Sequence, residues 1–285
     1  MALPYPEIDP VIVHIGPFGV RWYAVAYLAG LAIGWQWMRR QVAKPPFPMR
    51  REQVDDFLTW ATLGVVLGGR LGYVLFYKPL YYLQNPLEIL AIYRGGMSFH
   101  GGALGVVLAV IIFCRRNKLD LLAVGDLLST VVPIGLFFGR IANFINGELW
   151  GRPTSLPWGI VFPDAPDALP RHPSQLYEAA LEGLALFLIL RWATHRARWL
   201  PRQGAATGLF LLFYGLFRIA LETVRNPDIG MPNFPLGLTM GMILSIPMVL
   251  AGLWLVVRAL RAPIRPAASE PAPSAGAPSA KSPSA

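Results

Sequence analysis

Apolar runs of about 20 residues recur along this chain, and a run of that length can cross a bilayer as a helix. We find such runs at residues 19–38, 57–77, 97–114, 121–144, 174–193, 205–224 and 237–257. Only 14% of the residues are charged, whereas an average soluble domain has about a quarter. The sequence therefore predicts an all-α polytopic integral membrane protein with seven transmembrane helices.

Charged residues alternate in sign between successive connections. Basic residues follow the first, third, fifth and seventh runs: Arg39, Arg40, Arg115, Arg116, Arg196, Arg198, Arg258 and Arg261. The other connections hold most of the acidic loop residues, among them Glu7, Asp9, Asp164 and Asp167. By the positive-inside rule, this pattern predicts an N-terminus outside and a C-terminus in the cytoplasm. The net charge of +9 then reflects topology and contact with anionic inner-leaflet lipid, not binding of nucleic acid.

The chain divides into one membrane domain and a tail. We expect residues 1–261 to form the membrane domain, with a rigid, irregular, proline-rich external cap at about 145–173. Residues 262–285 consist mainly of Ala, Pro and Ser and predict a disordered cytoplasmic tail. Residues 1–10 lack a basic n-region, so we expect the first helix to be retained and not cleaved.

Three arginines interrupt the apolar runs near the same face of the bilayer: Arg70, Arg140 and Arg218. A cation within hydrocarbon costs roughly 2.5–3.5 kcal/mol on insertion scales, so it is normally retained for a ligand or a counter-ion. The sequence pattern places one carboxylate, that of Glu222, near these three arginines. The surplus of positive charge predicts a bound anion.

The sixth run carries Tyr214, Arg218 and Glu222 at steps of four residues. This spacing places the three side chains on one face of a helix, within reach of each other. They could form a buried ion pair that only fixes helix packing. Alternatively, Glu222 and Tyr214 hold a cation that is aimed at an anionic group.

The end of the fourth run offers a guanidinium and amides together. Arg140 and Asn143 share a face of the last helical turn, and the chain that leaves the membrane contains Asn146, Glu148 and Gly151. This could be an ordinary amphipathic helix end. However, guanidinium and amide donors also fit the oxygens of a phosphate.

The third run begins with His100, Gly101 and Gly102. The amides of a helix N-terminus can donate to an anion, and glycines allow a ligand or a neighbouring backbone to approach closely. His100 is a candidate general base, because imidazole titrates near neutral pH. A structural hydrogen bond is the alternative role for this histidine.

Other chemistries find little support in the sequence. No histidines and carboxylates have the spacing of metal ligands, and neither a GxSxG motif nor a P-loop occurs. We therefore expect neither a metal nor a cofactor. The lone cysteine, Cys114, lies at the opposite end of its run from the arginines and suits a small apolar packing role. An enzyme of this kind would take its nucleophile from a second substrate.

At this point the motifs resemble those of the bacterial phosphatidylglycerol–prolipoprotein diacylglyceryl transferases. The run Gly139-Arg140-x-Ala142-Asn143-Phe144-Ile145-Asn146-x-Glu148-x-x-Gly151 is similar to the signature of that family. The elements His100-Gly101-Gly102, Arg171–Glu178 and Tyr214/Arg218/Glu222 also resemble family elements, in the same order. The resemblance covers about residues 5–260.

The resemblance implies an enzyme that moves the diacylglyceryl group of phosphatidylglycerol to the lipobox cysteine of a prolipoprotein, as the first step of lipoprotein maturation. A thioether forms and glycerol phosphate leaves. The implied location is the bacterial inner membrane, with the active site facing the periplasmic leaflet. The resemblance assigns Arg140 and Arg218 to the lipid phosphate and His100 to proton transfer, with Glu222 or an arginine-polarised water as the alternative acceptor.

We therefore expect catalytic roles for His100, Arg140, Tyr214, Arg218 and Glu222, and substrate-binding roles for Tyr23, Arg70, Gly101, Gly102, Asn143, Asn146, Glu148 and Gly151. A transporter for an anionic solute is the competing interpretation, and a lipid-binding scaffold is a third. A transporter predicts repeats and polar residues that continue to the cytoplasmic side. Here Asp126 alone lies deeper, where we expect a helix-packing or end-capping role.

Overall fold

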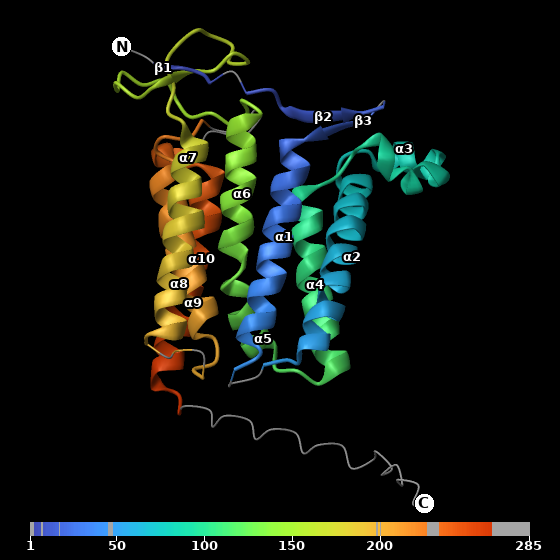
Figure 1. Cartoon of the computed structure of the whole chain (residues 1–285), viewed down its shortest axis with the longest axis vertical. Helices are drawn as coiled ribbons and strands as arrows, with labels where there is room; N and C mark the ends of the chain where they lie inside the picture. Colours follow the sequence, from blue (N-terminus) through green and yellow to red (C-terminus); the bar gives the residue numbers. More distant parts are fainter. Residues whose placement is uncertain are drawn as a thin grey trace, which may run out of the picture.

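A computed structural model describes residues 3–6, 8–16, 18–44, 48–197, 199, 201–226 and 234–263. The described chain is mostly helical, and its long helices run side by side (Figure 1). The α-helices are α1 (Trp22–Gln41), α2 (Arg51–Phe76), α3 (Pro79–Gln84), α4 (Phe99–Asn117), α5 (Leu121–Ser129), α6 (Val132–Ile145), α7 (Ser174–Glu178), α8 (Leu186–His195), α9 (Ala205–Leu221) and α10 (Met240–Arg261). A π-helix, η3 (Ala179–Ala185), joins α7 to α8, and short 3-10 helices form η1 (Pro86–Leu90), η2 (Ile92–Arg94) and η4 (Pro235–Gly237).

The mainly helical prediction is confirmed, and each of the predicted apolar runs contains helix. Within the described ranges, 3 helical stretches are long and apolar enough to cross a membrane: Arg51–Phe76, Leu121–Ile145 and Met240–Arg261. The last of these is α10, and the second combines α5 and α6. The predicted disordered tail, apart from its first two residues, lies outside the described residues.

The prediction of a purely helical chain was wrong in detail, because two small sheets are present. Strands β1 (Leu3–Pro4) and β4 (Ile160–Val161) pair in parallel, and β2 (Val11–Ile15) pairs antiparallel with β3 (Phe18–Arg21). The start of the first apolar run is therefore strand, and α1 begins only after this hairpin. Residues 146–173 form the predicted irregular segment, which we call the cap, and both sheets lie at the same end of the helices (Figure 1). We call this end the cap end.

Glycines bring α2 and α4 into close contact. A side chain on Gly105 would collide with the carbonyl oxygen of Gly64, and one on Gly101 would collide with that of Gly68. Gly72 extends the same contact line, since an added Cβ would lie 2.7 Å from the Cα of Gly101. Small residues at such spacing let helix backbones approach where the solvent provides no hydrophobic driving force. The glycine repeat in the second run thus fixes the α2–α4 pair.

The remaining long helices pack on the other side of α1. Helix α1 contacts α6 on one side and α2 on the other (Figure 1). Helices α9 and α10 pack closely because Gly208 and Gly252 lie at their contact, where an added side chain would meet backbone atoms of the facing helix. Asp126 on α5 accepts hydrogen bonds from the backbone N–H of Gly204 (2.7 Å) and Thr207 (2.8 Å). It therefore caps the N-terminus of α9, which confirms its predicted structural role.

Arg70 organises the connection between α3 and α4. Its side chain is buried, and its guanidinium lies over the ring of Tyr82 at 5.2 Å. A guanidinium has five N–H donors, and Arg70 donates at 2.6–3.4 Å to the carbonyl oxygens of Glu88, Ile89, Ala91, Gly95 and Gly96. With every donor engaged by backbone, Arg70 holds the loop in place. These contacts give Arg70 a structural role, and its predicted contact with an anion stays a prediction.

The α2–α4 contact predicts a large effect of Gly105→Ala. The new methyl group meets a carbonyl oxygen of α2, and overpacking of this kind costs roughly 1–3 kcal/mol. Gly102→Ala, in the same helix, is the matched control, because its Cβ meets nothing closer than 3.5 Å. Thermal unfolding in detergent should show a lowered midpoint for Gly105→Ala only. Equal midpoints for the two variants would contradict the packing account.

The Arg70 contacts predict that Arg70→Lys loosens residues 85–96. An ammonium cannot reach five carbonyls in one plane, and each lost charged hydrogen bond is worth about 1.5–3 kcal/mol. Hydrogen exchange followed by mass spectrometry should show faster exchange in this loop. Arg39→Lys is the control, since Arg39 forms a partly exposed ion pair with Asp55 at 2.7 Å. Unchanged exchange combined with weaker anion binding would return Arg70 to the ligand site.

Candidate functional site

Six charged side chains meet at the cap end of α6, α7, η3 and α9. We call them the Arg–Glu cluster: Arg140, Glu178, Glu182, Arg218, Glu222 and Arg225. The sequence predicted two of these arginines and Glu222 as site residues. The structure brings them together with a third arginine and two further carboxylates.

Glu178 links the two predicted arginines. Its Oε2 lies 2.8 Å from Nη2 of Arg140 and 3.3 Å from Nη1 of Arg218, so both guanidinium groups reach one carboxylate oxygen. Glu182 lies farther away, with oxygens 3.8 Å from the same two nitrogens. Two cations held this close can bind the oxygens of one anion between them.

The π-helix η3 positions these carboxylates. Its wider turn begins directly after Glu178 and contains Glu182, and both residues face α6 and α9. Gly183 permits the approach, because an added Cβ would lie 2.7 Å from the Cβ of Phe137 on α6. Such π-helical turns are frequent at functional sites.

Arg218 and Glu222 pair along α9, as their spacing predicts. Nη2 of Arg218 lies 2.8 Å from Oε1 of Glu222, and Nη1 of Arg225 lies 3.3 Å from the same oxygen. Glu222 rests against Gly241 in the first turn of α10, where any side chain would collide with the carboxylate. Carboxylates are stabilised at a helix N-terminus, so α10 helps to hold Glu222.

Only the arginines of the cluster reach its surface. The side chains of Arg140 and Arg218 are 18% and 14% exposed, whereas those of Glu178 and Glu182 are 0% exposed. Three cations and three carboxylates are present, so the cluster is neutral when all are ionised. An approaching ligand would therefore meet guanidinium groups before carboxylates, and binding of an anion at the cluster stays a prediction.

The cap covers the cluster through its backbone. Gly151 donates to the carbonyl of His172 at 2.9 Å, and Arg152 donates to that of Val224 at 2.8 Å. Nε of Arg152 also donates to the carbonyl of Arg225 at 2.9 Å. A side chain on Gly151 would lie 2.6 Å from the carbonyl oxygen of Val224. A packing requirement thus explains Gly151, which the sequence predicted as a substrate contact.

Side-chain amides hold the segment that follows α6 in place. Nδ2 of Asn143 donates to Oε1 of Glu148 at 2.8 Å, and Asn146 reaches the same oxygen at 3.4 Å. Gln175 donates to the backbone carbonyl of Glu148 at 2.6 Å. The two asparagines therefore orient Glu148, and their predicted contact with substrate stays a prediction.

Two tyrosines border the cluster. Tyr23 on α1 lies with its hydroxyl 3.2 Å from that of Tyr27, and Tyr214 on α9 stacks on Phe210. Each tyrosine interacts electrostatically with Arg140. The structure thus brings both predicted tyrosines to the site.

The predicted site element at the start of α4, His100 to Gly102, lies away from the Arg–Glu cluster. His100 is exposed in the first turn of α4, where the side chain of Ser98 caps the helix by accepting from the amide of Gly101 at 3.1 Å. Helix α4 packs mainly against α2, on the other side of α1 from α6 in Figure 1. Gly101 is needed for that packing, whereas a Cβ on Gly102 would make only ordinary contacts with α2, the nearest at 3.5 Å. A role of His100 as general base stays a prediction.

Side chains of the cap are fixed by hydrogen bonds. Tyr5 donates to the carbonyls of Phe144 (2.7 Å) and Ile145 (2.8 Å) at the end of α6, and burial raises the pKa of its hydroxyl. Burial lowers the pKa of His172, whose Nδ1 lies 3.4 Å from the hydroxyl of Tyr177. His172 is therefore neutral near pH 7 and can accept from this hydroxyl.

Sequence reasoning missed part of the cluster. It expected one carboxylate among the arginines, and the structure shows three. Two signals were available: Glu178 and Glu182 lie four residues apart within an apolar run, and Arg225 follows Glu222 by three residues. Within the described ranges, no group of His, Cys, Asp and Glu could hold a metal ion.

Comparison with known proteins agrees with this arrangement. Residues 10–258 match the family model described as prolipoprotein diacylglyceryl transferase. A phosphatidylglycerol–prolipoprotein diacylglyceryl transferase of Phenylobacterium zucineum is 57% identical over 281 residues, which cover 93% of this chain and 97% of that protein. Proteins of the same name from Paramagnetospirillum magneticum (57% over 269 residues, 93% and 99% covered) and Caulobacter sp. (52% over 301 residues, 93% and 98% covered) are also similar. The chain belongs to the prolipoprotein diacylglyceryl transferase family.

Proposed function

We propose that this protein transfers the diacylglyceryl group of phosphatidylglycerol to the lipobox cysteine of prolipoproteins. The family and the names of its relatives support this reaction. The observation that carries it is the pair of guanidinium groups, those of Arg140 and Arg218, which share Glu178 and reach the surface of the cluster. Phosphatidylglycerol brings the phosphate that such a pair recognises.

The arginines act on the leaving group. The thiol sulfur attacks the carbon of the diacylglyceryl group, the carbon–oxygen bond breaks, and its electron pair moves to the phosphate oxygen. Arg140 and Arg218 stabilise the charge that develops there, and this electrostatic effect grows in a buried site. The thiol must lose its proton, to His100, to Glu222 or to a polarised water.

The other predicted site residues fall into two groups: those that lie near the guanidinium groups and those that hold other side chains of the site in place. Tyr23 and Tyr214 border the guanidinium groups and can contact the lipid headgroup. Asn143 and Asn146 hold Glu148, and Glu222 holds Arg218. The cap fixes the chain that follows α9, through the contacts of Arg152 with the carbonyls of Val224 and Arg225.

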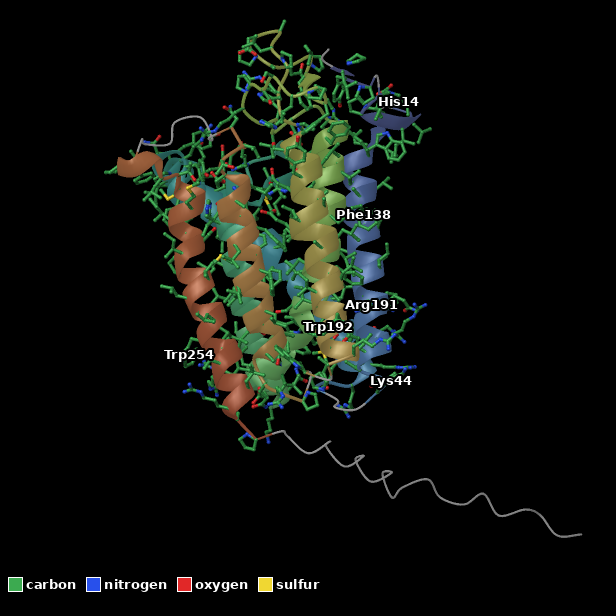
Figure 2. All side chains as sticks on the ribbon, turned by 90° about the vertical axis from the view of Figure 1, so that its left-hand side faces the viewer. His14, Lys44, Phe138, Arg191, Trp192 and Trp254 are labelled. Carbon is green, nitrogen blue, oxygen red and sulfur yellow. The ribbon has the colours of Figure 1, made fainter. Side chains whose placement is uncertain are left out.

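The proposed topology has seven membrane-spanning helices and the cap end outside. Figure 2 places Lys44 and Arg191 at one end of the molecule and His14 at the other. Basic residues also occupy the last turns of helices that end away from the cap: Arg39, Arg40, Arg115, Arg116, Arg258 and Arg261. The positive-inside rule then puts that end in the cytoplasm and the site at the periplasmic leaflet of the inner membrane. In this proposal residues 1–261 form the membrane domain.

A transporter needs a polar path to the opposite end. Asp126 is the acidic residue that the sequence placed deeper, and its oxygens are used to cap α9. Because Asp126 is used in this cap, it does not supply a polar path across the protein, and this favours the transferase over the transporter.

Arg140→Lys should lower turnover roughly 10²-fold, because an ammonium cannot make two parallel hydrogen bonds to phosphate. The measurement is mass spectrometry of a lipobox peptide incubated with purified protein and phosphatidylglycerol. The control is Arg191→Lys at the opposite end, where Arg191 stacks on Trp37 at 5.3 Å. Near-normal adduct formation by a folded Arg140→Lys variant would remove Arg140 from the site.

Cys114→Ser should stay active, because the nucleophile comes with the prolipoprotein. Cys114 is 2% exposed within a core that includes Phe57 and Phe113, as its predicted packing role requires. The hydroxyl should cost some stability, and Cys114→Ala serves as the control for lost volume. The same peptide assay measures both variants. Loss of turnover in folded protein would mean that the chain supplies the sulfur.

A further inference from the structure

The three carboxylates of the Arg–Glu cluster are not equally satisfied. Oε2 of Glu178 accepts from Arg218 at 3.3 Å and pairs with Arg140 at 2.8 Å, and Oε1 of Glu222 accepts from Arg225 at 3.3 Å. Oε1 of Glu178 is buried without a hydrogen-bond partner in the described part of the chain, but its Oε2 is engaged, whereas both oxygens of Glu182 lack such a partner. The side chain of Glu182 is 0% exposed.

A buried carboxylate without hydrogen bonds is unfavourable in its charged form. Glu182 faces charged and titratable groups from each neighbouring element: Arg140 on α6, Tyr214 and Arg218 on α9, Arg225 after α9, and Glu178 on α7. Each arginine that is nearest to Glu182 already holds a closer carboxylate, Glu178 or Glu222. Glu182 is thus the carboxylate that the cluster needs least as an anion.

The net charge of the Arg–Glu cluster also points to Glu182 as the carboxylate that carries a proton. With three arginines and three ionised carboxylates the cluster is neutral and attracts an anion weakly. A proton on Glu182 gives the cluster a net charge of +1, which matches the single negative charge of a phosphodiester. The protonated carboxyl also becomes a donor next to Arg140 and Arg218.

We propose that Glu182 carries a proton in the resting protein and is a positioning residue for the lipid phosphate. Its proton leaves Arg140 and Arg218, which reach the surface of the cluster, with a net positive charge toward the phosphate. This proposal rests on the proposed function, because it assumes that these arginines bind the phosphate of phosphatidylglycerol.

Glu182→Gln tests the proposal, since glutamine keeps the shape and donor of a protonated glutamate and cannot ionise. The measurement is KM for phosphatidylglycerol from about pH 6 to about pH 9 with purified protein and a lipobox peptide. In the unsubstituted protein, rising pH removes the proton, and KM should rise on the order of tenfold, as for typically coupled binding sites. Glu182→Gln should turn over and lose this rise in KM.

Glu178→Gln is the matched control, four residues away and equally buried. It removes the anion that holds Arg140, so turnover should fall at every pH. If Glu182→Gln abolishes turnover at every pH in folded protein, Glu182 acts as an anion and the proposal is wrong. A KM that still rises with pH in Glu182→Gln would place the proton on another group and equally overturn it.

Infrared spectroscopy separates this proposal from the proposed function. The carbonyl stretch of a protonated carboxyl should appear in the lipid-free unsubstituted protein and be absent in Glu182→Gln. Its absence from the unsubstituted protein overturns the proposal without regard to activity. The band could be present while Arg140→Lys and Arg218→Lys leave KM for the lipid unchanged. The arginines would then not bind the phosphate, and the role proposed for the Glu182 proton would be wrong as well.

Discussion

Arg140 and Arg218 both reach the same oxygen of Glu178, at 2.8 and 3.3 Å, in a part of the protein where water is largely excluded. Removing one partner of such a buried pair typically costs about 3–5 kcal/mol, so the surrounding elements must keep both helices in register. Three features keep the helices aligned: the π-helix, the contact of Gly183 with Phe137, and the contact of Glu222 with Gly241. The cap adds backbone contacts that fix the chain after α9.

Glycine contacts provide the rigidity on which this site depends. In lipid, helices gain little from burying apolar side chains against each other, so close backbone packing has to replace the hydrophobic effect. Helices α2 and α4 are joined in this way, and so are α9 and α10. Arg70 contributes in a different manner, because it donates to several backbone carbonyls of the connection between α3 and α4 and so holds that loop together. A buried cation can therefore serve architecture or ligand binding, and only its partners distinguish the two.

Much of the arrangement followed from the sequence. The helical character and the α9 face of Tyr214, Arg218 and Glu222 depend on local spacing, which residues alone reveal. The sequence predicted a packing or capping role for Asp126, but not its partners, because Gly204 and Thr207 lie 78 and 81 residues away. The structural partners of Arg70 could not be predicted, because they are backbone carbonyl oxygens, which leave no trace in the sequence. The full set of carboxylates was also missed, because Glu178 and Glu182 meet the arginines only through the packing of η3 against α6 and α9. Gly151 was read as a ligand contact because the backbones that crowd it come from residues 172 and 224.

The central claim is that Arg140 and Arg218 bind the phosphate of phosphatidylglycerol. Determination of the structure of the protein with bound phosphatidylglycerol tests it most directly. The account predicts phosphate oxygens within hydrogen-bond distance of both guanidinium groups. A phosphate bound elsewhere, with the contacts of Arg140 and Arg218 to Glu178 and Glu222 unchanged and no lipid headgroup between them, would contradict it.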